Sequence, residues 1–255
     1  MESGRIVFLG CPLDMIAPGE MLARAAKALG GRGRLRIEGL NVAKLVEARG
    51  DPALMAALRE AEMVHVDGAG ISLGLKALGM AAPERRAGID LMGDLCGLAA
   101  AMDSGVYLLG ARPEVVRAAA RRLADSTPGL KIAGIRDGYF AAAQEADVVR
   151  DIRRSGAGIL FIGISSPRKE RFLRAHWQQL GVAVGMGVGG SFDVVSGALR
   201  RAPNWMQRHG LEWLFRLKQE PARLFARYAR TNFCFLWLLV RARVGAKQEP
   251  EHHAN

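Results

Sequence analysis

A chain of 255 residues in which half the residues are hydrophobic is long enough to bury a sizeable core, which excludes a largely disordered protein. Three widely spaced cysteines match neither a zinc site nor a disulfide framework, and no segment reaches the roughly 20 apolar residues that a membrane span needs. With no signal peptide at its start, the chain is therefore expected to be cytoplasmic.

Short apolar segments alternate along the chain with longer segments of helical periodicity. The expected strands, in chain order, are Arg5–Leu9, Leu35–Leu40, Met63–Asp67, Val106–Gly110, Lys131–Ile135, Gly158–Ile164 and Val182–Gly187. The expected helices are Glu20–Leu29, Ala53–Ala61, Asp90–Met102, Pro113–Leu123, Ala146–Ser155 and Pro167–Leu180. This alternation predicts an α/β fold over residues 1–199, a Rossmann-like parallel sheet flanked by helices.

The net charge of +11 is concentrated near the C-terminus, because residues 200–247 carry 11 Lys and Arg against two acids. We expect this part to be a basic helical appendage and residues 248–255 to be a disordered tail. The apolar run Phe233–Val240 is too short to span a bilayer, but it suits a helix that lies at an anionic membrane surface. A helix docked on the core with a solvated basic face is the alternative.

Asp67 ends an apolar strand and is followed by Gly68-Ala69-Gly70, which allows a tight turn. Ligands of open parallel sheets bind at the carboxyl ends of the strands, so this carboxylate is a candidate base that accepts a proton from a hydroxyl. The alternative is a turn aspartate that caps a helix starting near Ser72.

Three further segments are candidate anion sites, each with an ordinary structural alternative. Arg85 and Arg86 suit a diphosphate, and the alternative, which their position alone favours, is a solvated charged loop. Lys169 lies in a helix start, Pro167-Arg168-Lys169-Glu170, that attracts anions or is simply capped. The glycine-dense run from Gly185 to Asp193 fits the dinucleotide fingerprint poorly and otherwise predicts a tight strand-to-helix turn.

Taken together, these segments resemble the WecG/TagA/CpsF family of bacterial glycosyltransferases, from about Leu9 to Arg230. The resemblance rests on the number and order of short matching stretches, which are Asn41-Val42, Val66-Asp67-Gly68-Ala69-Gly70, Glu84-Arg85 with Gly88, Tyr107-Leu108-Leu109-Gly110, Gly138-Tyr139-Phe140, Pro167-Arg168-Lys169-Glu170, Gly189-Gly190-Ser191-Phe192-Asp193, Arg201-Ala202-Pro203, Gly210-Leu211-Glu212-Trp213, Arg216-Leu217, Glu220-Pro221 and Arg223. No single stretch is specific by itself.

The resemblance implies an inverting transfer of a hexose or N-acetylhexosamine from a UDP-sugar to a polyprenyl-diphosphate-linked sugar, in the synthesis of exopolysaccharide, teichoic acid or common antigen. Residues 1–199 would be the nucleotide-sugar-binding domain, and the enzyme would sit peripherally on the inner face of the cell membrane. The family's general base falls on Asp67 and its conserved arginine on Arg85. Its substrate-binding positions fall on Asn41, Lys169, Asp193, Arg216 and Arg223, the last two in the appendage.

The chain departs from the family pattern at two positions near the expected donor site. Gly39 stands where the family usually has threonine, and Lys169 stands where it usually has glutamine. Both departures bear on which sugar is transferred rather than on the reaction class.

We expect no metal cofactor, since no Asp-x-Asp pair follows a strand and arginines are available to balance the charge of UDP. A basic nucleic-acid-binding protein is the main alternative, because the pI is about 10.3, but no recognition motif accompanies the charge. A dehydrogenase is disfavoured by the late position of the glycine-rich run. The oligomeric state stays open, with a homo-oligomer as one alternative.

Overall fold

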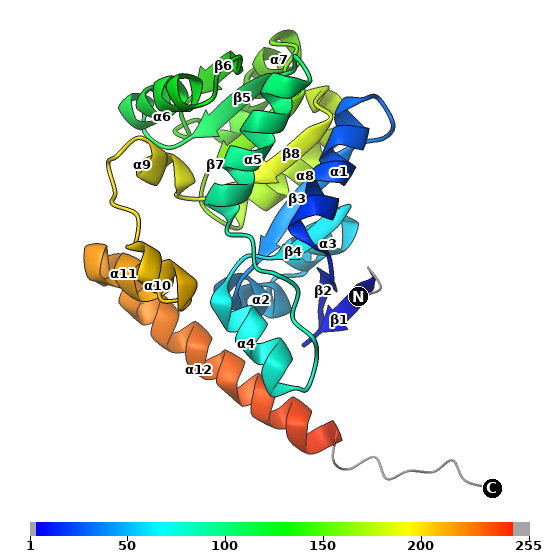
Figure 1. Ribbon diagram of the computed structural model, residues 1–255, viewed down its shortest axis with the longest axis vertical. Helices are drawn as coiled ribbons and strands as arrows, with labels where there is room; N and C mark the ends of the chain where they lie inside the picture. The colour runs from blue at the N-terminus through cyan, green and yellow to red at the C-terminus, as the bar shows by residue number, and fades with distance from the viewer. Residues whose placement is uncertain (1–3, 247–255) are drawn as a thin grey trace, which may run out of the picture.

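The computed structural model describes residues 4–246, which form a six-stranded, fully parallel sheet flanked by helices (Figure 1). The strands lie in the order β4-β3-β8-β7-β5-β6. Their bounds are β3 Leu35–Leu40, β4 Met63–Val66, β5 Gly105–Gly110, β6 Lys131–Arg136, β7 Ile159–Gly163 and β8 Val184–Gly187. The α/β class is confirmed, and the six expected strands from Leu35 onward are all present.

Helices cover both faces of the sheet, as parallel strands require. One face packs against α1 (Pro18–Leu29), α5 (Gly88–Ala101) and α6 (Pro113–Ser126). The other packs against α3 (Pro52–Glu60), α7 (Glu145–Arg154, after the short 3-10 helix η1, Ala142–Gln144) and α8 (Arg168–Leu180). The side chains of the buried strand β7 alternate between the two faces of the sheet. Ile159 and Phe161 pack on the side of α1, α5 and α6, and Leu160 and Ile162 pack on the side of α7 and α8.

The first expected strand lies outside this sheet. β1 (Arg5–Phe8) pairs antiparallel with β2 (Cys11–Asp14) in a separate hairpin. Leu9 and Gly10, the two loop residues, both have positive φ (47° and 88°), as the tight turns of two-residue hairpins require. The alternating sheet pattern therefore begins only at β3.

Two short helices follow the first two strands of the sheet, and the first of them is not among the helices expected from the sequence. α2 (Val42–Gly50) begins at Asn41, whose Oδ1 accepts a hydrogen bond from the Lys44 backbone N–H. α4 (Ala69–Ala77) begins at Gly68, earlier than the expected start near Ser72. Both helices thus start directly beside the carboxyl ends of β3 and β4.

The chain leaves the sheet through α9 (Ser191–Val195) and continues as α10 (Asn204–Arg208), α11 (Glu212–Gln219) and the 26-residue helix α12 (Pro221–Ala246). α12 runs along the side of the molecule past α2 and α4 (Figure 1). On its inner side Leu224, Phe235 and Leu238 are buried, and Arg227 pairs with Glu47 of α2. The expected appendage is therefore helical and docked on the core, while the tail at 248–255 lies outside the described residues.

The outer side of α12 carries large apolar side chains that are exposed to solvent: Phe225, Phe233, Leu236, Trp237, Val240 and Val244. We call these six residues the outer apolar face. Within residues 4–246, none of the helices combines the length and apolar character that crossing a bilayer demands.

Candidate active site

The loops that follow the parallel strands meet at one edge of the sheet, because all six strands run in the same direction. Most of the residues singled out in the sequence lie on these loops or on helices that start there. They are Asn41 after β3, Asp67 after β4, Lys169 at the start of α8 after β7, and Asp193 in α9 after β8.

The carboxylate of Asp67 is held by groups from two other segments. Its Oδ1 accepts a hydrogen bond from the backbone N–H of Gly88, the first residue of α5, at 2.9 Å. Its Oδ2 lies 3.4 Å from Nδ2 of Asn41, which donates to it. Gly68, rather than Asp67, is the N-cap of α4, so the alternative of an aspartate that caps its own helix is wrong.

Two glycines lie beside Asp67, and the first of them needs its small size. A Cβ atom at Gly39 would lie 2.8 Å from the Cβ of Asp67, closer than non-bonded carbons approach. A Cβ atom at Gly88 would lie 3.4 Å from Oδ1 of Asp67. The close approach of β3 and α5 thus fixes the orientation of this side chain.

Arg85 connects the catalytic core to the appendage. Its Nη1 donates to Oε2 of Glu212 in α11 at 2.7 Å, and its Nη2 donates to the carbonyl oxygen of Gln207 at 3.2 Å. Its neighbour Arg86 pairs with both carboxylate oxygens of Asp94. Both arginines are therefore engaged in ion pairs within the protein, and Arg85 as a catalytic residue stays a prediction.

Arg216 of α11 reaches back to the strand edge. Its guanidinium packs directly against Gly190. A Cβ atom built on Gly190 would collide with this guanidinium and would lie 3.5 Å from Oδ2 of Asp193, so the two side chains are close together. The pKa of Asp193 is raised, chiefly because the carboxyl is partly buried. The positive charge of Arg216 lowers this pKa, and the negative charge of Glu220 raises it further. Nε of Arg216 is buried and has no hydrogen-bond partner among the described residues, so the guanidinium retains capacity to bind an anion.

Arg223 lies farther out than Arg216. It is exposed, and its guanidinium forms two hydrogen bonds to Glu220, at 2.9 and 2.6 Å. The structure therefore brings together Asp67 with Asn41 and Asp193 with Arg216, and it places Arg223 at the rim.

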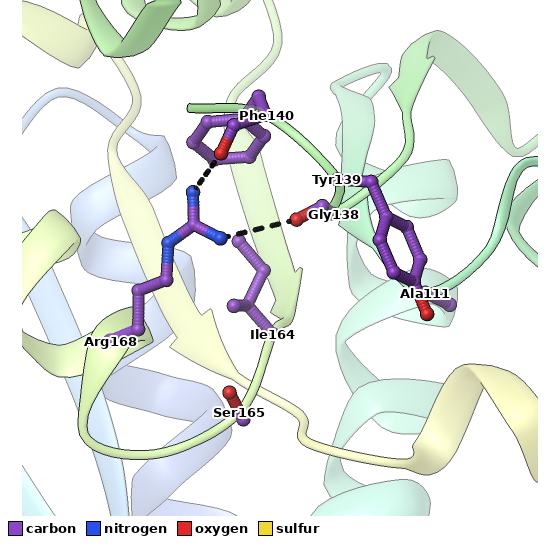
Figure 2. A pocket seen from close by; sticks show the side chains of 7 residues that line it. All are labelled: Ala111, Gly138, Tyr139, Phe140, Ile164, Ser165 and Arg168. Atoms are coloured by element: carbon purple, nitrogen blue, oxygen red, sulfur yellow. Dashed lines mark hydrogen bonds between the residues drawn. The ribbon is translucent and has the colours of Figure 1, made fainter. Parts of the chain in front are cut away.

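A cavity of about 510 Å³ opens at the carboxyl ends of β5, β6 and β7 (Figure 2). It is lined by Ala111, Gly138, Tyr139, Phe140, Ile164, Ser165 and Arg168. Figure 2 shows the Arg168 guanidinium directed at the backbone oxygens of Phe140 and Gly138, at 2.5 and 3.4 Å, and the Tyr139 ring on the Ala111 side. The Tyr139 side chain is 74% exposed, so its ring is available for stacking.

Lys169 does not line this cavity. Its ammonium group is buried and bonded to Glu170, in contact with a second buried pair formed by Lys44 and Glu38. Burial and the charge of Lys44 lower the pKa of Lys169. The structure thus places this predicted substrate-binding residue beneath the site.

Sequence reasoning missed several residues that organise the site. Glu38 and Lys44 carry no motif, and Glu212 drew notice only as part of a matching stretch, although it is the partner of Arg85. The glycine-rich run from Gly185 to Asp193 is the tight connection from β8 to α9. Among residues 4–246, no three His, Cys, Asp or Glu side chains gather as metal ligands, and metal independence stays a prediction.

Comparisons with known proteins identify the family of the chain. The chain is 32% identical over 166 residues to the N-acetylglucosaminyldiphosphoundecaprenol N-acetyl-beta-D-mannosaminyltransferase of Bacillus subtilis (strain 168). The aligned part covers 65% of this chain and 64% of that relative, which is less than two thirds of the relative's length. The sequence profile of the family described as "Glycosyl transferase WecG/TagA/CpsF family" matches residues 6–249. The chain therefore belongs to the WecG/TagA/CpsF family of glycosyl transferases.

Proposed function

We propose that the protein is an inverting glycosyltransferase that moves a hexose or N-acetylhexosamine from a UDP-sugar to a polyprenyl-diphosphate-linked sugar in cell-surface polysaccharide synthesis. The observation that carries the proposal is the fixed carboxylate of Asp67 at the ligand-binding edge of a parallel sheet, with Arg216 of the appendage at the same edge. Membership of the family supports the reaction class.

The cavity beside Tyr139 is the proposed site of the donor nucleotide. Its volume of about 510 Å³ falls in the range of small-molecule sites, roughly 300–1,000 Å³. The exposed Tyr139 ring offers a stacking surface for a base. The neighbouring strand β8 leads to Gly190 and Arg216, where the diphosphate would meet backbone amides and a guanidinium.

In the proposed reaction, Asp67 accepts the proton of the acceptor hydroxyl as that oxygen attacks the anomeric carbon of the donor sugar. The new C–O bond forms on the face opposite to the bond that breaks, so the configuration inverts. UDP leaves with the bonding electron pair, and Arg216 stabilises the negative charge that develops on it. Asn41 orients the carboxylate through its hydrogen bond.

The appendage is the proposed contact with the membrane that holds a lipid-linked acceptor. The outer apolar face of α12 lies among basic residues, including Arg230 and Arg241, as in helices that lie at anionic lipid surfaces. The name of the Bacillus subtilis relative specifies an undecaprenol-diphosphate-linked N-acetylglucosamine acceptor, which supports the acceptor class proposed here.

The proposal is tested by offering a panel of UDP-sugars with a polyprenyl-diphosphate-linked acceptor and measuring UDP release. We expect release with one donor class, and a product whose anomeric configuration, read by NMR coupling constants, is opposite to that of the donor. Retained configuration would overturn the inverting mechanism, and no release with any donor would overturn the function. Sedimentation with anionic vesicles, compared with gel shift on duplex DNA, separates this proposal from a nucleic-acid-binding role.

A further inference from the structure

Four charged side chains form a buried cluster beneath the site, and the proposed reaction does not use them. They are Glu38 of β3, Lys44 of α2, and Lys169 and Glu170 in the first turn of α8, each at most 6% exposed. Nζ of Lys44 bonds Oε2 of Glu38 at 2.7 Å and lies 3.0 Å from Oε1 of Glu170, which Lys169 also contacts. We call these four residues the charged cluster.

The charged cluster contains two acids and two bases, so its charges balance. Burial raises the pKa of Glu170, but the charges of Lys44 and Lys169 outweigh burial and bring it to about 2. Burial lowers the pKa of Lys44, and the two glutamates more than reverse this effect. The contact between Lys44 and Glu170 joins α2 to α8, so movement of α8 away from α2 would remove this stabilising interaction.

On one side, the charged cluster adjoins the donor cavity. Lys169 and Glu170 directly follow Arg168, which lines that cavity. Arg168 also holds the loop of Gly138 and Phe140 through hydrogen bonds to their carbonyl oxygens. The position of α8 therefore sets the position of one wall of the cavity.

On the other side, the charged cluster reaches Asp67. The backbone N–H of Lys44 donates to Oδ1 of Asn41 at 3.0 Å, and Nδ2 of Asn41 donates to Asp67. A continuous series of contacts thus runs from the donor cavity through Glu170 and Lys44 to the carboxylate.

We propose that Lys44 and Glu170 are positioning residues whose buried ion pair sets the distance between the donor cavity and Asp67. This inference rests on the proposed function, in which the donor sugar and the base must be aligned for in-line attack. Both side chains are buried, and neither lines the donor cavity. Misplacement of reacting groups by about 1 Å is enough to cost on the order of 10²-fold in rate.

The test uses the double variant Lys169→Gln/Glu170→Gln in the full chain. It removes the two charges that α8 contributes to the charged cluster and leaves the Glu38–Lys44 pair balanced, so no charge is stranded in the interior. We expect kcat to fall at least roughly tenfold, while the Kd for UDP, measured by calorimetry, changes less than about threefold. Lys44→Gln removes the same pair from α2 and also leaves the buried Glu38 without its partner, so its loss of kcat should be at least as large.

Arg174→Gln is the matched control. Arg174 lies on the same helix and pairs with Glu60 of α3 at the surface, with no connection to Asn41. We expect its kcat and its Kd for UDP to equal those of the wild type.

Three results would overturn the inference: a folded double variant with wild-type kcat, a loss confined to UDP affinity, or an equal loss of kcat in Arg174→Gln. A wild-type protein that binds no UDP and transfers no sugar would instead overturn the proposed function.

Discussion

Arg85, in the loop before α5, donates a 2.7 Å hydrogen bond to Glu212 of α11 across 127 positions of sequence. The pair is mostly buried and joins the catalytic core to the appendage. Since Arg216 lies one turn further along α11, the pair also fixes the place from which Arg216 reaches the strand edge.

The first prediction follows from this pair. Glu212→Gln keeps the size of the side chain and removes the charge that holds Arg85. We expect it to lower kcat roughly as much as Arg85→Ala, by about tenfold, because both changes loosen α11. Loss of one partner of a buried hydrogen bond typically costs about 1–3 kcal/mol. The kcat of both variants is measured from the rate of UDP release. Loss of activity in Arg85→Ala alone would place Arg85 on the substrate, as the resemblance implies.

Substitution of Asp67 tests the proposed base. Asp67→Asn keeps the acceptor for the Gly88 N–H but removes basicity, so kcat should fall by roughly 10²-fold or more. The thermal unfolding midpoint should stay close to that of the wild type. Asp14→Asn is not a suitable control, because Asp14 is buried and bonded to Arg5 and to the Val64 backbone. A folded Asp67→Asn protein with wild-type turnover would exclude Asp67 as the base.

Arg216 is expected to act on the leaving group. Arg216→Ala should lower kcat by roughly 10²-fold, as loss of a preorganised donor to a developing negative charge typically does. Lys218→Ala, an exposed basic residue on the same helix, is the control and should leave kcat unchanged. Both are assayed with detergent-solubilised acceptor, so that membrane binding does not enter. Equal effects of the two substitutions would point to net charge rather than to the position of Arg216.

The outer apolar face of α12 is expected to carry membrane binding. Phe233 and Trp237 are 74% and 54% exposed, so Phe233→Ser/Trp237→Ser should spare the fold and weaken sedimentation with anionic vesicles at least tenfold. Ile135→Ser, at an exposed apolar residue of β6 far from α12, is the matched control. Point substitutions are preferable to truncation before Arg200, because truncation would uncover the core that Phe235 and Leu238 bury. Unchanged sedimentation of the double variant would contradict the membrane role of this face.

Transfer is expected to need no divalent ion. Addition of a chelator should leave the rate of UDP release unchanged, because arginine side chains are proposed to balance the charge of the leaving diphosphate. The measurement is a rate with and without chelator, followed by addition of magnesium or manganese. Activity that disappears with the chelator and returns with the metal would contradict the prediction.

The centre of the sheet was predictable because a strand such as Ile159–Gly163 is buried on both faces and reads as a continuous apolar run. The hairpin of β1 and β2 was not predictable from the sequence. Its second strand, Cys11–Asp14, is short and contains a proline, and its turn depends on the positive φ angles of Leu9 and Gly10. Strand order was equally inaccessible, since β7 and β8 insert between β3 and β5 through contacts distant in sequence.

The candidate site was predictable where a residue directly follows a strand, as with Asp67 and Asn41. It was not predictable for Lys169, where sequence shows a basic residue at a helix start but not the two glutamates that bury it. The partner of Arg85 lies in the appendage, and no local pattern connects residues so far apart.

Gly39 makes the position of the proposed base sensitive to a single methyl group. A Cβ atom at this position would lie 2.8 Å from that of Asp67, so even alanine does not fit here while Asp67 keeps its present rotamer. A substitution at position 39 would therefore displace the carboxylate of Asp67 or push β3 away from it. Any change of donor preference engineered at position 39 has to be separated from a change in the placement of Asp67.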